Sequence, residues 1–409
     1  MQLESHAFIS STPSAFFERQ TVFLTGGTGG LGGCLLLKLA LEVNTSKIYV
    51  LVRGSAARAR SRWNETMPMQ IGSILATRRI HFVVGDMTME NFGIEPATLR
   101  EMEDCVTIII HSAGNISLTD SIKESVADNC IPTLELSQLA SSFKNLYRFV
   151  HLSTAYANSH LPDGLVEEKI YNFGDAETQL REILETGTIS KEMISNFPWS
   201  YAFGKHLTER LLLSRNPKLP LLIIRPTNIG PAISQPYPFY GPTGSCPVST
   251  YMRTYMESPD SGVVHVSSRN TAGSNIIDEI PVDLVANLIL LHLVHGTTGI
   301  VHTSSQSYVP RRLSQFHDEI RMFTPQELSG TPFSYVVDKR IKQGHYAEFW
   351  KVMGRDWHFS DAASRLLKGY KGSLNIDISG HDSGGFMKKR AKLIAEEVES
   401  RMKKCKSKL

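Results

Sequence analysis

Tyr201 and Lys205 are the residues whose types and spacing point most directly to chemistry in this chain of 409 residues. Residues four apart on a helix share one face, so both side chains would project together. A tyrosine hydroxyl has an ordinary pKa of about 10, and a nearby ammonium group favours the phenolate and lowers that pKa. The same lysine could hydrogen-bond the ribose of a nicotinamide cofactor. The pair therefore predicts acid–base chemistry beside a bound nucleotide.

Two neighbouring hydroxyl groups, those of Ser153 and Thr154, stand at the end of the apolar run 149–153. A hydroxyl at the end of a strand could hold a substrate carbonyl and stabilise the oxyanion that develops on it. Hydrogen bonding to nearby backbone is the plainer role for either side chain. The spacing alone leaves both as candidates.

Histidines and cysteines do not point to a metal. His111 and His151 occupy strand positions, where a buried and hydrogen-bonded structural histidine is the favoured interpretation. Neither has partners at metal-ligand spacing, so no metal site is predicted. The five cysteines are scattered without a CxxC pair, which fits a reducing compartment and excludes a disulfide framework.

Gly26, Gly29 and Gly32 form a GxxGxxG turn between the apolar run 21–25 and a helix-like pattern at 31–43. Glycine tolerates positive φ in a tight turn, and its missing side chain lets a pyrophosphate approach the backbone. Amides at the start of the following helix attract that anion. Because the turn has a strand before it and a helix after it, the segment predicts dinucleotide binding.

Arg53 directly follows the second apolar run, 48–52, where an NAD-binding chain usually carries Asp or Glu for the ribose diol. Arginine at this place accommodates a 2′-phosphate through its planar fork of donors. Arg58, Arg60 and Arg62 follow, and no carboxylate occurs before Glu65. Two of the four arginines are expected to belong to a solvated basic surface. The pattern favours NADPH over NADH.

Further cofactor contacts are expected after the third and fourth apolar runs. Asp86 is placed to accept a hydrogen bond from an adenine amino group, with a turn or helix N-cap role as the alternative. The small residues Ser112, Ala113 and Gly114 would let the second ribose of a dinucleotide pass.

Short apolar runs that alternate with longer helix-like patterns must position these candidates. The runs expected as strands are 21–25, 48–52, 80–84, 106–111, 149–153 and 221–225. The alternation predicts an α/β fold, a doubly wound Rossmann-type parallel sheet with helices on both faces. Fully apolar strands fit a sheet that is covered on both sides.

Two long stretches, 158–198 and 231–275, interrupt the alternation, and long loops in compact domains are usually lids or substrate walls. From about residue 311 the pattern becomes mixed and more helical. We therefore predict a main domain over 1–310 and a smaller, mainly helical C-terminal domain over 311–409. An apolar stripe at helical spacing in that region is expected to pack on the rest of the chain. The stripe consists of Met387, Ala391, Ile394 and Val398.

Composition narrows the classes of protein. The net charge is +3 and 20% of the residues are charged, which argues against disorder and gives no reason to expect a nucleic-acid partner. Apolar stretches such as 284–294 are too short to span a bilayer, so no transmembrane helix is predicted. Residues 1–20 lack the basic start and long apolar run of a secretory signal.

The chain ends in Ser407-Lys408-Leu409, a tripeptide that the peroxisomal import receptor reads as an address. The lysines just before it should keep the tail solvated and accessible. We therefore expect the import receptor as a partner and the peroxisomal matrix as the location.

At these motifs the sequence resembles the alcohol-forming fatty acyl-CoA reductases, also called male-sterility-type proteins, and the related thioester reductase domains. The similar segments are 16–26, 49–53, 85–88, 111–113 with Asn129, 151–158 with 167–171, 201–205 and 224–227. The likeness runs from about residue 14 to 305, and 151–158 with 167–171 is its most specific part.

The resemblance implies an extended short-chain dehydrogenase that reduces an acyl-CoA thioester with NADPH to an aldehyde and on to a primary alcohol. Its register selects Thr154 over Ser153. Thr154 and Tyr201 would hold the oxyanion, and Lys205 would orient the cofactor. With the motifs above, the expected cofactor contacts are Thr25, Gly26, Thr28, Gly29, Gly30, Leu31, Gly32, Arg53, Asp86, Ser112, Ala113, Tyr201, Lys205, Pro226 and Thr227.

The sequence also departs from the family pattern. Gly30 stands where the family usually has an aromatic residue, Pro132 replaces a glycine, and 236–240 lacks the usual Gly-Trp. The part after residue 310 is shorter than the family's C-terminal domain.

Two other functions fit the same fold. One is an NADP-dependent dehydrogenase of a secondary alcohol or ketone, of sterol or polyketide type, or a sugar-nucleotide epimerase. Epimerases retain NAD, against which Arg53 argues. The other is a non-catalytic NADPH-binding regulator, which would have no need of Thr154, Tyr201 and Lys205 together.

Overall fold

Seven parallel strands form the central sheet of the computed structural model, which describes residues 12–242, 244–257 and 261–406. They are β1 (Thr21–Thr25), β2 (Lys47–Val52), β3 (Ile80–Val84), β4 (Ile108–His111), β5 (Arg148–Leu152), β7 (Leu221–Pro226) and β12 (Gly299–Thr303). Their order is β12-β7-β5-β4-β1-β2-β3, so the direction of winding reverses between β1 and β4. In open α/β sheets, ligands bind beyond the carboxyl ends of the strands at such a reversal. The predicted Rossmann-type sheet is confirmed.

Both faces of the sheet are buried. Val22 and Leu24 of β1 belong to one hydrophobic cluster, and Phe23 between them belongs to a second. The three isoleucines at 108–110 in β4 divide between the two clusters in the same way. Because successive side chains of a strand point to opposite faces, the two clusters cover opposite sides of the sheet.

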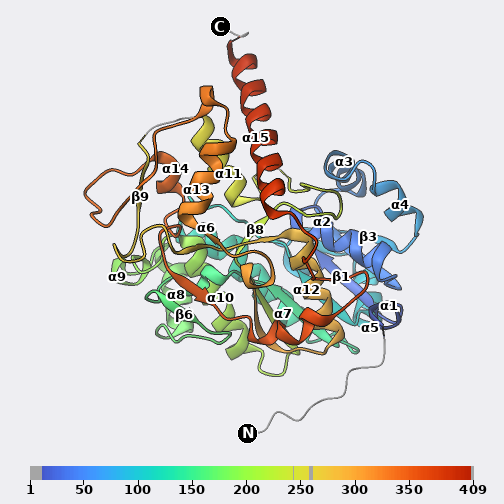
Figure 1. Cartoon of the computed structure of the whole chain (residues 1–409). Helices are drawn as coiled ribbons and strands as arrows, with labels where there is room; N and C mark the ends of the chain where they lie inside the picture. Colours follow the sequence, from blue (N-terminus) through green and yellow to red (C-terminus); the bar gives the residue numbers. More distant parts are fainter. Residues whose placement is uncertain (1–11, 243, 258–260, 407–409) are drawn as a thin grey trace.

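Helices supply the other half of each cluster. The longer helices are α2 (Gly30–Leu37), α3 (Ala56–Thr66), α5 (Pro96–Cys105), α7 (Ile131–Ala140), α8 (Ala176–Thr186), α10 (Ser200–Arg215), α11 (Pro247–Glu257), α12 (Val282–Val294), α13 (Leu313–Phe323) and α15 (Ser383–Lys406). The shorter ones are α1 (Pro13–Phe17), α4 (Ile71–Ala76), α6 (Ile122–Ser125), α9 (Lys191–Ile194) and α14 (His345–Phe349), and π-helical turns span Lys38–Glu42 and Val126–Cys130. Helices α2 and α12 pack together on one face of the sheet, and α7 and α10 pack on the other (Figure 1).

In the part of the chain that the structure describes, short strands form four pairs outside the central sheet, and three of these pairs tie the C-terminal region to segments in or next to the two long insertions. They are β6 (Gly164–Val166), β8 (Asn228–Gly230), β9 (Val263–His265), β10 (Ile276–Ile277), β11 (Glu279–Pro281), β13 (Arg311–Arg312), β14 (Ser334–Val336) and β15 (Trp357–Phe359). Strand β15 pairs with β6, β14 with β9, and β13 with β10. A third hydrophobic cluster, which includes residues of α11, α13 and α15, lies among these elements. The predicted helical C-terminal region is present, and the domain boundary at residue 310 stays a prediction.

Helix α15 carries the predicted apolar stripe. Met387, Ala391, Ile394 and Val398 are buried, and the helix packs against α11 and α13. Its C-terminal half rises away from the body of the molecule (Figure 1). The expected packing of the stripe is confirmed.

Some predicted boundaries were wrong. Strand β4 begins at Ile108 rather than at residue 106, because Val106 still caps the C-terminus of α5. Strand β5 ends at Leu152, which places Ser153 just beyond it. Strand β12 was not predicted. Among the described residues, no helix is long and apolar enough to cross a bilayer.

Candidate active site

The glycine-rich turn lies at the reversal point of the sheet, against the carboxyl end of β4. Gly26 has a φ of +73°, and a Cβ atom there would lie 2.6 Å from the Ala113 nitrogen. A Cβ atom on Gly32 would lie 2.0 Å from the Gly26 oxygen. The turn is closed by a hydrogen bond from the Gly29 amide to the Gly26 carbonyl at 2.9 Å. Glycine is therefore required at both positions by the close approach of backbone segments.

The start of α2 fits the pyrophosphate of a dinucleotide. Gly29 is its N-cap, and within the described residues no side-chain cap bond is made at this end of the helix. Thr28, Gly30 and Leu31 are half-buried and Gly29 is exposed, so these predicted contacts line an accessible helix N-terminus. Free amides and the helix dipole attract an anion at this place.

Thr25 joins the ends of β1 and β4. Its hydroxyl bonds Nδ1 of His111 at 2.8 Å and accepts from the Ala113 amide at 3.3 Å. The Ser112 hydroxyl donates to the Thr25 carbonyl at 2.7 Å. Nε2 of His111 bonds the Thr133 hydroxyl at 2.9 Å, and burial lowers the pKa of His111 to about 3. His111 is thus the satisfied structural histidine that was predicted, and it stays neutral.

His151 differs from that expectation. It is fully buried, and neither of its ring nitrogens has a hydrogen-bond partner in the described part of the chain. Burial, the Lys205 ammonium and neighbouring His111 hold its pKa well below the usual range. The interpretation of His151 as hydrogen-bonded was wrong, because its β5 position turns the ring into a site without polar partners.

Arg53 and Asp86 meet where β2 and β3 end. Nε of Arg53 lies 3.3 Å from Oδ2 of Asp86, and the Arg53 side chain is 74% exposed. The Thr88 amide and hydroxyl both donate to the other Asp86 oxygen, at 3.0 and 2.9 Å. These bonds and the Arg53 charge lower the pKa of Asp86. Asp86 therefore makes the turn contact that was its alternative role, with one oxygen still facing Arg53.

The other three arginines after β2 lie differently. Arg62 pairs with Glu65 at 3.0 Å, and the guanidinium of Arg60 stacks over Phe82 at 5.1 Å. A Cβ atom on Gly54 would lie 3.9 Å from Nη1 of Arg58. Arg58 therefore lies beside the turn that follows β2, as Arg53 does.

Lys205 is buried at the carboxyl end of β5. Its Nζ donates to the Leu152 carbonyl at 2.8 Å, and a Cβ atom on Gly114 would lie 3.6 Å from it. Burial lowers the pKa of Lys205 to about 8, although Glu209 acts in the opposite direction. The lysine that was predicted to orient the cofactor is therefore fixed between β5 and the segment after β4.

Asn129, in the π-helical turn, fixes that segment after β4. Its Oδ1 accepts from the Asn115 amide at 2.8 Å, and its Nδ2 donates to the Asn115 carbonyl at 3.0 Å. A Cβ atom on Gly114 would lie 2.9 Å from Oδ1 of Asn129. The resemblance of this segment to the family pointed to Asn129. The two hydrogen bonds between Asn129 and the Asn115 backbone are found only in the structure.

The two candidate hydroxyl groups after β5 have different partners. Ser153 donates to Oε1 of the buried Glu209 at 2.5 Å. Thr154 accepts from the Tyr156 amide at 3.3 Å and donates weakly to the Pro226 carbonyl at 3.5 Å. The Ser153 hydroxyl is bonded to a carboxylate, whereas the Thr154 hydroxyl makes only long hydrogen bonds to backbone atoms.

Glu209 belongs to a buried ion pair that sequence reasoning missed. Its carboxylate accepts from Nε and Nη2 of Arg225 at 2.9 and 2.5 Å, and neither side chain is exposed. Nη1 of Arg225 donates to the Lys169 carbonyl at 3.0 Å. Glu209 lies four residues after Lys205, so it continues the same face of α10 and fastens that helix to β7. The four-residue spacing between Lys205 and Glu209 is the feature of the sequence that could have indicated a role for Glu209 near the site.

Tyr201 is the second residue of α10 and is half-buried. Its hydroxyl makes no hydrogen bond to any described residue. Burial raises its pKa. The expected lowering of this pKa by Lys205 was wrong, because burial is the effect that acts on the Tyr201 hydroxyl.

The Thr227 side chain is bonded to a neighbouring segment of the chain. Its hydroxyl donates to Oδ1 of the buried Asp278 at 2.8 Å. Pro226 contributes its carbonyl to Thr154. These two predicted cofactor contacts therefore lie on the floor of the site, where they hold β7.

Part of the 231–275 stretch lies against the glycine-rich turn. The Tyr240 hydroxyl donates to the Gly30 carbonyl at 3.0 Å, and a Cβ atom on Gly30 would lie 3.1 Å from the Ser245 hydroxyl oxygen. An aromatic side chain at position 30 would displace this stretch. The two departures from the family pattern, at Gly30 and in 236–240, are thus adjacent in space.

Among the residues that the structure describes, no group of three or more His, Cys, Asp or Glu side chains is placed to hold a metal ion.

Comparison with known proteins identifies relatives along most of the chain. Fatty acyl-CoA reductase 1 of Xenopus laevis is 28% identical over 294 residues, which are 67% of this chain and 54% of that protein. Fatty acyl-CoA reductase 2 of Homo sapiens is 27% identical over 301 residues, 68% of this chain and 55% of that protein. This chain thus spans little more than half the length of these two curated relatives.

A solved structure with the same architecture is the terminal R domain from the myxalamid PKS-NRPS biosynthetic pathway. It has a TM-score of 0.65 and 17% sequence identity, and the match covers 92% of this chain and 90% of that domain. At this identity the likeness establishes the fold. The sequence profile described as male sterility protein matches residues 24–289, well over half of the 409 residues. This chain therefore belongs to the male sterility protein family.

Proposed function

We propose that this protein uses NADPH to reduce an acyl-CoA thioester to an aldehyde and then to a primary alcohol. The observation that carries the proposal is that Thr154 follows β5, Tyr201 and Lys205 lie on the first turns of α10, and Lys205 lies against Gly114, next to the Ala113 backbone that the glycine-rich turn approaches. The names of the relatives support a fatty acyl thioester as the substrate.

The hydroxyl groups of Thr154 and Tyr201 would donate to the carbonyl oxygen of the substrate. Donors that are already in place stabilise the negative charge that develops on that oxygen. Because burial raises the pKa of Tyr201, its hydroxyl stays protonated at neutral pH and can donate. Lys205 gives one N–H bond to the Leu152 carbonyl and keeps two for the nicotinamide ribose.

Bound NADPH would supply the hydride. The first reduction consumes one thioester, one NADPH and one proton, and it yields an aldehyde, the CoA thiol and NADP⁺. The second consumes the aldehyde, another NADPH and another proton, and it yields the primary alcohol and NADP⁺. Tyr201 would give the proton to the alkoxide oxygen.

The preference for NADPH rests on Arg53. Its contact with Asp86 is exposed, and exposed ion pairs contribute only about 0–1 kcal/mol. A 2′-phosphate could therefore replace Asp86 as the partner of the Arg53 guanidinium at little cost.

The function is tested with purified protein, NADPH and acyl-CoAs of different chain lengths, by following NADPH loss and free thiol together. Two NADPH consumed for each thiol would establish alcohol formation, and one would establish aldehyde formation. Turnover of a secondary alcohol or ketone without thioester consumption would contradict the proposal and favour the dehydrogenase alternative.

Peroxisomal import stays a prediction, and its three residues, 407–409, lie outside the described part of the chain. The test compares an N-terminally fluorescent fusion of the whole chain with one that lacks these residues. We expect the first to coincide with a peroxisomal marker and the second to spread through the cytosol. Identical distributions would refute the prediction.

A further inference from the structure

A cavity of about 500 Å³ opens away from the candidate active site, on the face covered by α2 and α12. Four segments line it: the π-helical turn after α2, the loop 233–235, the start of α12, and 373–381. Lys38, in that turn, lies eight residues beyond Gly30, which is about 12 Å along a helix that rises 1.5 Å per residue. The cavity is therefore separate from the glycine-rich turn.

The loop on one wall is held by buried carboxylate bonds. Asp283 accepts from the amides of residues 233, 234 and 235 at 3.1, 2.9 and 3.2 Å. Nζ of Lys38 donates to Oε1 of Gln235 at 2.6 Å, and Nε2 of Gln235 donates to Glu42 at 2.8 Å. These bonds fix the wall before any ligand arrives.

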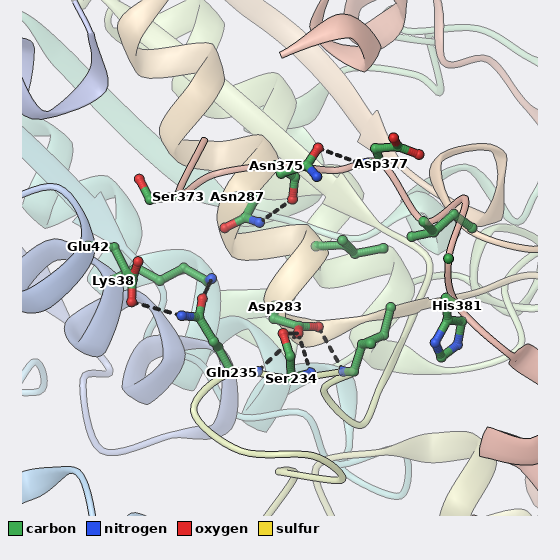
Figure 2. A pocket seen from close by; sticks show the side chains of 14 residues that line it. Lys38, Glu42, Ser234, Gln235, Asp283, Asn287, Ser373, Asn375, Asp377 and His381 are labelled. Carbon is green, nitrogen blue, oxygen red and sulfur yellow. Dashed lines mark hydrogen bonds between the residues drawn. The ribbon is translucent and has the colours of Figure 1, made fainter. Parts of the chain in front are cut away.

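Asn287, in the wall of this cavity, has one buried oxygen without a hydrogen-bond partner in the described part of the chain. Its side chain is only 5% exposed, and its Nδ2 donates to the Asn375 carbonyl at 2.7 Å. Its Oδ1 is buried and has no hydrogen-bond partner among the described residues. Figure 2 shows this oxygen turned toward the part of the cavity that Lys38 and Glu42 line. A buried acceptor without a partner is costly, so its place in a cavity wall points to a ligand with a donor.

The remaining groups on the walls restrict the ligand. Lys38 keeps two N–H donors and Glu42 keeps one carboxylate oxygen. An apolar ligand would leave all of these unbonded.

An anion would meet the carboxylates of Glu42, Asp283 and Asp377. A cation bound to Oδ1 of Asn287 would face the Lys38 ammonium, which lines the same part of the cavity. A hydroxyl group both donates and accepts, so one hydroxyl satisfies a carbonyl oxygen and an ammonium together. We propose that this cavity binds a small neutral polyol, one hydroxyl of which donates to Oδ1 of Asn287 and accepts from Lys38.

The test measures binding to the whole chain by calorimetry, with glycerol and myo-inositol as probes and with spermidine and citrate as charged comparators. Ser373→Trp fills the cavity from an exposed position that makes no hydrogen bond to described residues, and Ser373→Ala is its matched control. We expect saturable polyol binding in the millimolar range that Ser373→Trp weakens by about tenfold or more, which corresponds to one lost interaction of about 1.4 kcal/mol. Ser373→Ala should bind like the natural chain.

A second variant, Asn287→Leu, removes the open acceptor and should also abolish polyol binding in protein whose melting shows that it is folded. The proposal is overturned if neither polyol binds saturably, if spermidine or citrate binds instead, or if Ser373→Trp binds as well as Ser373→Ala. Since no readout involves thioester reduction, failure here is distinguishable from failure of the proposed reductase activity.

Discussion

At the scale of single residues, two neighbouring side chains of the same chemical type can differ in function because they have different hydrogen-bond partners. Ser153 and Thr154 both carry a hydroxyl, yet Ser153 is bonded to the buried Glu209 and Thr154 has only weak backbone contacts. Ser153 therefore supports α10, and the proposed contact with the substrate falls to Thr154.

Thr154→Val should therefore reduce kcat by about 10²- to 10³-fold, the usual loss when one oxyanion donor is removed. Ser153→Ala should instead lower the free energy of unfolding by about 1.5–3 kcal/mol, because it deletes a hydrogen bond to a carboxylate. Steady-state kinetics and urea unfolding of both variants check this. A larger kcat loss in Ser153→Ala at unchanged stability would reverse the assignment.

Arg53→Gln should raise the KM for NADPH by about tenfold or more while leaving the KM for NADH unchanged, because charge-assisted bonds to the 2′-phosphate contribute about 1.5–3 kcal/mol. Arg62→Gln is the matched control, since Arg62 pairs with Glu65. Kinetics with both cofactors provide the measurement. Equal changes for NADPH and NADH would exclude a 2′-phosphate contact.

Lys205 should make NADPH affinity depend on pH. Its pKa of about 8 means that the buried ammonium loses its proton as pH rises through that value. The unfolded chain keeps this proton up to about pH 10.4, so the contribution of Lys205 to the free energy of unfolding increases over this interval. A loss of NADPH affinity in this pH interval would therefore not be caused by unfolding that results from the titration of Lys205.

The measurement is NADPH binding by fluorescence titration from neutral to alkaline pH. We expect the affinity to decline above about pH 8 in the natural chain. In Lys205→Arg the affinity should be weaker but flat, because the guanidinium stays protonated. A parallel decline in both proteins would assign the titration to another group.

At the scale of elements, the sequence predicts those strands that are formed by a local run of apolar residues. Six of the seven central strands were expected because each is a compact apolar run. Strand β12 contains only Ile300 and Val301 as apolar residues, pairs with β7 alone at the sheet edge, and so lacks that signal. The short strands β13 to β15 have two or three residues each and exist only through distant partners.

The candidate site divides in the same way. Tyr201 and Lys205 were found from helical spacing, and the glycine-rich turn from its neighbours in sequence. The bond between Ser153 and Glu209 spans 56 positions, and that between Thr227 and Asp278 spans 51. No periodicity in the chain encodes such contacts, because the first arises only when β5 and α10 pack together and the second only when the segment after β7 meets the residue between β10 and β11.

Glycine substitution tests the turn as an element. Gly32→Ala places a Cβ atom 2.0 Å from the Gly26 oxygen, so the turn must open and NADPH affinity should fall by more than about tenfold. Gly72→Ala in α4 is the control, because nothing lies within 4 Å of its Cβ atom. That change should stabilise the helix by up to about 1 kcal/mol without affecting NADPH. Unaltered affinity in Gly32→Ala would show that the turn does not hold the cofactor.

At the scale of the whole molecule, one buried ion pair connects the last helix with the centre of the chain. Arg390 of α15 binds both oxygens of Glu279 in β11, at 2.8 and 2.9 Å. The guanidinium also donates to the Ser249 hydroxyl of α11. Both members of the pair are buried, and β11 continues directly into α12 beneath the central sheet. The region after residue 310 should therefore unfold together with the Rossmann part.

Arg390→Met leaves the Glu279 carboxylate buried without its partner, which typically costs about 3–5 kcal/mol. We expect a single urea transition to shift to lower midpoint, with circular dichroism and NADPH binding lost together. Arg401 lies on the same helix and makes only exposed ion pairs, with Glu257 and Glu397. Arg401→Met should therefore lower the free energy of unfolding by no more than about 1 kcal/mol. If Arg390→Met instead produced an early transition that spared NADPH binding, the C-terminal region would be an independent domain docked on the reductase fold.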